Sequence, residues 1–154
     1  MSKYHDVIPT PLGDLYCRIE DEKIAYLSPF PSTIHTYTSP HPLLKECKDQ
    51  IQAYFSHRLR DFHLPLQIKG SPFTQAILKN LLQIPYSTSL SYQQLAILAG
   101  FPKAYRAAGT TLSRNPFLLL LPCHRVICSN GLSGDYAWGK ANKEWLLKFE
   151  KSIS

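Results

Sequence analysis

The tightest constraint on this chain is the apolar run from Phe117 to Leu121, which is enclosed by Pro116 and Pro122. No apolar run in the sequence is longer, whereas a helix that crosses a membrane needs about 20 such residues. Five apolar residues between two breakers are the length of one buried β-strand. The run therefore predicts a strand in the core of a globular protein, and Pro122 marks its expected end.

The composition is that of a folded protein and not of a disordered or membrane-spanning one. The 154 residues are 44% hydrophobic and 18% charged, which suits one domain, or one domain with a small partner. The first residues hold no apolar signal core, and we expect the four cysteines to be reduced. We therefore expect no secretion, no membrane partner and a cytoplasmic location (nuclear in a eukaryote).

The basic residues gather in the second part of the chain. Residues 1–69 carry eight basic and eight acidic side chains, whereas residues 70–154 carry nine basic and three acidic ones, which accounts for the net charge of +6. We expect two domains, over residues 1–69 and 70–154. The asymmetry favours a polyanionic partner for the second, although a basic surface kept for solubility would have the same composition.

Residue patterns predict strands in the first part and helices in the second. Partly alternating residues predict strands near 3–9, 14–19 and 23–28, then a proline-rich loop at 29–42 and a helix from 43 to about 58. Caps and apolar spacing predict further helices at 72–84, 92–99, 102–113 and 140–151. In the last of these, Trp145 and Phe149 are expected to face the core.

The two central helices have the outline of a helix-turn-helix. Ser91 and Gln94 have the spacing of a capping box, Gly100 is a stop signal, and the helix that follows is basic. Two packed structural helices would have the same outline, so the pattern alone leaves both interpretations open.

The predicted buried strand ends at a cysteine. Pro122 fixes its backbone φ and so holds Cys123 in a defined direction. A thiol is a poor nucleophile near neutral pH unless a base or a positive charge favours the thiolate. His124 follows, but adjacent side chains of extended chain point opposite ways, so their contact needs a turn or a bridging water. Arg125 is expected to form a structural ion pair, and a buried structural cysteine stays the alternative for Cys123.

Six motifs of the second part occur together in one known family. In chain order they are SYQQLAILAG, AYRAAG, RNP, LLPCHRVICSNG, GDYAWG and KEWLL. This stretch, about residues 71–150, resembles the O6-alkylguanine-DNA alkyltransferases, or methylated-DNA–protein-cysteine methyltransferases, whose active-site signature is PCHRV. The resemblance implies an α+β fold: a small N-terminal ribonuclease-H-like α/β domain and a mostly helical C-terminal domain with a helix-turn-helix, for DNA binding and alkyl transfer.

The resemblance implies a role for five side chains in the reaction. Cys123 would accept the alkyl group, His124 would take the thiol proton through a water, and Glu150 would orient the imidazole. Asn115 would brace the turn that presents the cysteine, and Tyr92 would assist protonation of the departing guanine. No cofactor and no metal would be needed, because the alkylated base itself donates the group.

The resemblance also implies how the protein holds DNA. Arg106 would enter the base stack from the minor groove and fill the gap left by a flipped nucleotide. Small residues beside it would allow close approach, and two further cations would contact the backbone: Ala107, Ala108 and Gly109, then Lys103 and Arg114. The base pocket would be lined by Val126 and by the 131–138 loop, with Tyr136, Ala137 and Trp138.

Two pocket residues depart from the family pattern. Serine and then glycine commonly follow the pocket tyrosine, whereas this chain has Ala137 and Trp138. We expect the loss of a hydroxyl to weaken contact with guanine O6. We also expect the indole to narrow the pocket, so that methyl lesions are accepted and bulky ones disfavoured.

The function implied is DNA repair in a single event. A methyl (alkyl) group would pass from O6-methylguanine in double-stranded DNA to Cys123, and the thioether would have no route back to a thiol. A monomer is expected. Three alternatives are kept: a cysteine hydrolase with a Cys-His pair, a helix-turn-helix transcription factor, and a non-catalytic recognition protein for alkylated DNA, a group that lacks the acceptor cysteine.

Overall fold

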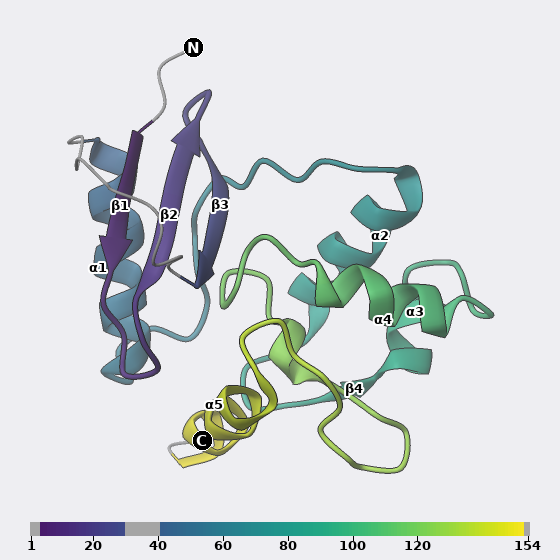
Figure 1. The fold of residues 1–154 in the computed structure, drawn as a ribbon. Coiled ribbons are helices and arrows are strands. Elements are labelled where there is room, and N and C mark those ends of the chain that lie inside the picture. Colours follow the sequence, from purple (N-terminus) through teal and green to yellow (C-terminus); the bar gives the residue numbers. More distant parts are fainter. Residues whose placement is uncertain (1–3, 30–40, 153–154) are drawn as a thin grey trace. The chain divides into compact units, whose positions relative to one another are not determined.

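Alternating residues in the first part form a three-stranded antiparallel sheet whose strands pair in chain order (Figure 1). β1 spans Tyr4–Ile8, β2 spans Leu15–Glu20 and β3 spans Lys23–Pro29, which confirms the three predicted strands. The computed structural model describes residues 4–29 and 41–152. Residues 30–40 of the predicted proline-rich loop lie outside this description.

One helix packs against this sheet. α1 (Pro42–Phe55) contacts β1 and β2, and the Sγ atoms of Cys17 on β2 and Cys47 on α1 lie 3.9 Å apart in a fully buried contact. The helix ends at Phe55 and not at the predicted Arg58, because His57 adopts a left-handed φ of 60°. Backbone of that kind cannot continue a right-handed helix.

The chain divides between residues 67 and 68 into two compact units, and helices predominate in the second (Figure 1). Its described elements are α2 (Pro72–Asn80), the 3-10 turn η1 (Leu81–Gln83), β4 (Leu90–Ser91), α3 (Tyr92–Leu98), α4 (Tyr105–Ser113), the 3-10 turn η2 (Cys123–Arg125), β5 (Val126–Ile127) and α5 (Lys140–Ser152). A strand-rich first unit and a helical second unit confirm the predicted α+β class.

The helix-turn-helix is present, and its caps explain its form. Ser91 and Gln94 make the predicted capping box at the start of α3. At its end Gly100 has a φ of 88°, and the Phe101 N–H donates to the Ala96 carbonyl at 2.9 Å, which completes a Schellman motif. α3 and α4 pack against each other and α2 packs against both. α4 begins three residues later than predicted, so that Lys103 lies in the turn and not in the helix.

The prediction of a strand from Phe117 to Leu121 is wrong, although all five residues are buried. The segment is a chain of turns: Leu119 has a φ of 69°, and the Leu121 N–H donates to the Phe117 carbonyl at 3.0 Å. Buried backbone groups need partners, and here local turns provide them in place of a neighbouring strand. The apolar run indicated burial correctly, but an apolar run does not distinguish a strand from a buried turn.

α5 has a buried face and an exposed one. Leu146 is fully buried, as are Lys143 and Glu150 three residues before it and four after it. The prediction that Trp145 faces the core is wrong, because its side chain is 38% exposed and stacks on Phe149 along the helix surface. Within the part of the chain described, no helix has the length and apolar character to cross a membrane.

The capping box gives a prediction for stability. Ser91→Ala removes the acceptor for the Gln94 N–H, which lies 3.1 Å from the serine hydroxyl. We expect the free energy of unfolding to fall by about 1 kcal/mol. Urea unfolding followed by circular dichroism measures this change. Ser89→Ala, at an exposed position just before the helix, is the matched control. Equal losses in the two variants would contradict a specific role for the cap.

Candidate active site

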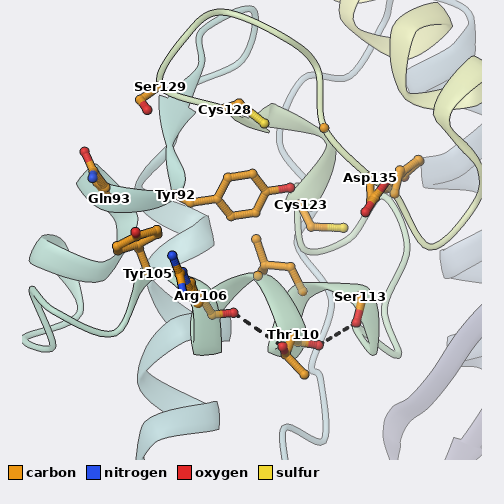
Figure 2. Close-up of a pocket in the computed structure, with 14 residues that line it drawn as sticks. Tyr92, Gln93, Tyr105, Arg106, Thr110, Ser113, Cys123, Cys128, Ser129 and Asp135 are labelled. Carbon is orange, nitrogen blue, oxygen red and sulfur yellow. Dashed lines mark hydrogen bonds between the residues drawn. The ribbon is translucent and has the colours of Figure 1, made fainter.

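A short parallel strand pair brings two distant segments together. Ser91 at the end of β4 pairs with Ile127 of β5, so that the start of α3 lies beside the segment that follows η2. Tyr92, the first residue of α3, consequently shares a cavity with Cys123. In Figure 2 the ring of Tyr92 extends across this cavity, with its hydroxyl toward the cysteine.

Asn115 fastens the turns that carry the cysteine. Its side-chain amide donates to the Leu121 carbonyl at 3.2 Å and lies 3.2 Å from Cys123 Sγ, and its oxygen accepts the Phe117 N–H at 3.0 Å. The same amide also lies within 3.3 Å of the Phe117 carbonyl. One buried side chain thus sets the path of residues 117–121 and contacts the thiol itself.

The Cys123 thiol is protonated at neutral pH. Burial raises its pKa to about 11, although the Asn115 hydrogen bond and the positive charge of Lys143 act in the opposite direction. The residue is only 3% exposed, yet it forms part of the cavity wall. A thiol in this condition needs a proton acceptor before it can act as a nucleophile.

The next residue, His124, is turned by η2 toward α5. His124 Nε2 lies 2.8 Å from Glu150 Oε2, and both side chains are buried. Burial lowers the pKa of His124, against the opposing effect of the Glu150 hydrogen bond and charge. The imidazole is therefore neutral near pH 7.

Arg125 forms the ion pair that the sequence predicted. Its Nε and one terminal nitrogen each lie 2.9 Å from an oxygen of Glu150, and its other terminal nitrogen donates to the Ile84 carbonyl at 2.9 Å. Burial alone would raise the pKa of Glu150, but the hydrogen bonds from His124 and Arg125 hold it far below its usual range. The carboxylate is therefore ionised.

These charge states define the imidazole tautomer. An ionised carboxylate only accepts hydrogen bonds, so Nε2 of the neutral His124 carries the proton and donates it to Glu150. The lone pair then lies on Nδ1, which is buried and has no hydrogen-bond partner among the described residues. Nδ1 is the atom of this network that is able to accept a proton.

Lys143 is a fully buried cation close to this network, and the sequence motifs did not single it out. Its Nζ donates to the Asp135 carbonyl at 3.1 Å and lies 5.7 Å from the centre of the Tyr92 ring. Its charge lowers the pKa of Cys123. The spacing did hold a signal: Lys143, Leu146 and Glu150 share one helical face, and a lysine on the face of a core leucine points inward.

A cavity of about 690 Å³ lies in front of the cysteine (Figure 2). Of the predicted site residues, its wall includes Cys123, Tyr92, Tyr136, Arg106 and Gly109. The 131–138 loop, which was expected to line the pocket, also contributes Gly134 and Asp135. The lining residues that sequence reasoning did not place there are Gln93, Tyr105, Thr110, Leu112, Ser113, Cys128 and Ser129. Most of these carry common polar side chains on loops and helix surfaces, which give no distinct sequence signal.

Three predicted pocket residues lie outside that wall. Val126 and Trp138 are buried, Ala137 is exposed, and none of the three lines the cavity. The structure therefore gives the Trp138 indole no direct contact with the cavity that it was expected to narrow. The Asn142 side chain instead donates to the Trp138 carbonyl at 2.9 Å, close to the start of α5.

The predicted DNA-binding residues are divided by burial. Arg106, Ala107, Lys103 and Arg114 are exposed, as a nucleic-acid contact requires. Ala108, one of the small residues expected to allow close approach, is fully buried and belongs to the core face of α4, so its own side chain is not available to DNA. Over residues 4–29 and 41–152, no group of three or more His, Cys, Asp or Glu side chains is placed to hold a metal ion.

The buried ion pair predicts how stability depends on pH. The folded-state pKa of Glu150 lies below its usual 4.5, so its stabilisation is present above pH 4.5 and is lost as the pH falls below it. The lowered pKa of His124 acts in the same direction from its usual 6.5 downward. Glu150→Gln leaves the buried Arg125 without its charged partner, so the free energy of unfolding at pH 7 should fall by about 3 kcal/mol. The loss below pH 4.5 should flatten, because glutamine does not titrate.

Urea unfolding between pH 7 and pH 4 tests this expectation. Glu144→Gln, at an exposed position on the same helix, is the control and should change stability by less than about 0.5 kcal/mol. If Glu150→Gln and the parent protein gave parallel pH curves, the ionised buried carboxylate would be refuted.

Lys143 gives a prediction for the thiol. Lys143→Met removes the positive charge that lowers the Cys123 pKa, so the thiolate should form only at higher pH. At neutral pH, alkylation of Cys123 by iodoacetamide should slow several-fold. The rate is followed at each pH from the mass of the tryptic peptide that carries Cys123. Lys148→Met, an exposed position on α5, should leave the profile unchanged. An unaltered profile for Lys143→Met would show that its charge does not act on the thiol.

Two family models together span most of the chain. The ribonuclease-like domain of 6-O-methylguanine DNA methyltransferase matches residues 3–68, and the DNA-binding domain of the same family matches residues 72–152. Both units of the structure therefore have a counterpart in one family.

Similar proteins of known name agree with these models. The methylated-DNA–protein-cysteine methyltransferase of Methanosarcina barkeri is 34% identical over 154 residues, 97% of this chain and 98% of the relative. The constitutive one of Bacillus subtilis is 38% identical, covering 96% and 95%. The structure of Mycobacterium tuberculosis OGT in complex with DNA has a TM-score of 0.87 at 35% identity, covering 97% of this chain and 93% of that one. The resemblance noted in the sequence is thus confirmed, and the chain belongs to the 6-O-methylguanine DNA methyltransferase family.

Proposed function

We propose that this protein repairs DNA by taking the alkyl group from O6 of a guanine onto Cys123. The observation that carries the proposal is a thiol on the wall of a cavity of about 690 Å³, next in sequence to a neutral imidazole that Glu150 holds in one tautomer. This is the arrangement of a nucleophile and its base, with a third group that orients the base.

The proton of the thiol has one acceptor in this network. His124 Nδ1 carries the free lone pair, and a water between Nδ1 and Sγ would complete the path. When the imidazole becomes positive, Glu150 already lies 2.8 Å from Nε2 and stabilises it. The thiolate then attacks the alkyl carbon, a sulfur–carbon bond forms, and the bond from that carbon to guanine O6 breaks.

Tyr92 is suited to give a proton to the leaving guanine. Burial raises its pKa to about 12, so its hydroxyl keeps the proton at neutral pH. Its ring packs beside Gly109 of α4, where a Cβ would come within 3.7 Å of the ring.

Tyr136 supports the substrate in another way. Its buried hydroxyl has no hydrogen-bond partner among the described residues and is able to bond to the base.

Access of a guanine to this cavity requires that the nucleotide leaves the duplex. α4 presents the exposed Arg106 at the cavity wall, where its guanidinium is able to fill the gap in the base stack. Among residues 68–152 the exposed cations outnumber the two exposed Asp and Glu side chains, Asp135 and Glu144, and favour the phosphate backbone: Lys69, Lys79, Lys103, Arg106, Arg114, Lys140, Lys148 and Lys151.

The alternatives from the sequence fit the site less well. A cysteine hydrolase would use the same Cys-His pair but would turn over without DNA. A transcription factor would need no thiol, and a recognition protein without transfer would lack Cys123. The family relationship favours transfer over each of these alternatives.

Mass spectrometry with an O6-methylguanine duplex tests the proposal. We expect one methyl group per protein and no further uptake with excess DNA. Cleavage by trypsin after Arg114, Arg125 and Lys140 separates the two thiols of the cavity, since Cys123 falls on peptide 115–125 and Cys128 on peptide 126–140. The methyl group should be found on the first peptide only.

Two variants complete this experiment. Cys123→Ala should bind the duplex with the parent affinity and accept no methyl group. Cys128→Ser should still be methylated on peptide 115–125. Repeated turnover, an unchanged protein mass, or a methyl group on peptide 126–140 would each overturn the assignment of Cys123 as acceptor.

A further inference from the structure

Tyr105 is an aromatic residue that the reaction as described above does not use. It is the first residue of α4, and its side chain is 37% exposed although it is large and apolar. The core contacts of α4 are made by Ala108 and Leu112, which are buried. The Tyr105 side chain instead lines the cavity in front of Cys123. An exposed ring on a cavity wall, beside the cation of Arg106, suggests a ligand with a flat apolar face.

The ring of Tyr105 lies against the guanidinium of Arg106. The Arg106 Cζ atom is 5.8 Å from the centre of the ring, within the range of a cation–π interaction. In the view of Figure 2, Arg106 lies between Tyr105 and Cys123. If a base enters the cavity toward the cysteine, Tyr105 therefore lies on the opposite side of the inserted Arg106.

That placement identifies which part of the DNA the ring would meet. If Arg106 takes the position of the flipped nucleotide, the base that remains on the opposite strand has lost its partner and lies on the side away from Cys123. Aromatic side chains stack on unpaired bases of any identity, because every base has a π face. The ring also limits the orientations open to the guanidinium beside it.

We propose that Tyr105 stacks on the orphaned base opposite the flipped nucleotide, and thereby stabilises the opened duplex together with Arg106. This inference rests on the proposed function, because it needs a nucleotide that is flipped from DNA. The stacking uses the face of the ring and not its hydroxyl. Tyr105 is then a positioning residue for the DNA reaction and takes no part in the transfer itself.

Single-turnover kinetics of Tyr105→Ala and Tyr105→Phe test the inference. The substrates are an O6-methylguanine duplex with cytosine opposite the lesion, the same duplex with an abasic site opposite, and O6-methylguanine as the free base. Ile97→Ala, at an exposed position on α3 outside the cavity, is the matched control. All rates are measured with protein below saturation, so that DNA affinity contributes to them.

We expect Tyr105→Ala to react about 10-fold more slowly with the cytosine duplex, as expected for the loss of one stacked base. Its rates with the abasic duplex and with the free base should stay within about twofold of the parent, because neither offers a base to stack on. Tyr105→Phe and Ile97→Ala should match the parent throughout.

Three results would overturn the inference. Tyr105→Ala could react with the cytosine duplex as fast as the parent, which would leave the ring without a role. It could be equally slowed on the abasic duplex, which would mean that the ring contacts the DNA backbone. It could be slowed on the free base, which would mean a structural role. If the parent protein itself transferred no methyl group, the proposed function would fail, and that outcome is separate from these three.

Discussion

The buried carboxylate of Glu150 is the interaction on which the rest of the active site depends. It accepts from His124 and from Arg125 at 2.8–2.9 Å, and so joins α5 to the turn that carries the cysteine. Arg125 continues the network to the Ile84 carbonyl. An ionised group in the interior is tolerated only when all of its partners are present, and for that reason these residues must fold as one unit.

In the same network the nucleophile and its base are in place, but neither is charged. The thiol is buried and holds its proton, the imidazole is neutral, and its free nitrogen is sealed from solvent. A permanently ionised thiol would react with any electrophile in its surroundings. Here the thiol and the imidazole are both present but uncharged. A substrate that fills the cavity excludes water, which strengthens each electrostatic contact. This suits a group that reacts once.

Basic residues of the second unit have two different uses. Eight of the ten are exposed and can meet phosphate, whereas Arg125 and Lys143 are buried and act on the carboxylate and the thiol. The net charge counted from the sequence combines both groups. Only burial tells which cations can meet a polyanion, and the three-residue spacing of Lys143 and Leu146 was the one local sign that a lysine turns inward.

The sequence by itself determined the helices, their caps and the chemistry at Cys123, because Ser71, Ser91 and Gly100 act on neighbours within a few residues and the signature around the cysteine is contiguous. Only the tertiary structure decided the turns of residues 117–121, the exposure of Trp145, the burial of Ala108 and the composition of the cavity wall. Those features depend on partners distant along the chain. The contact of Glu150 with His124 spans 26 positions, and it was expected from the family resemblance alone, because no local pattern encodes a contact of that separation.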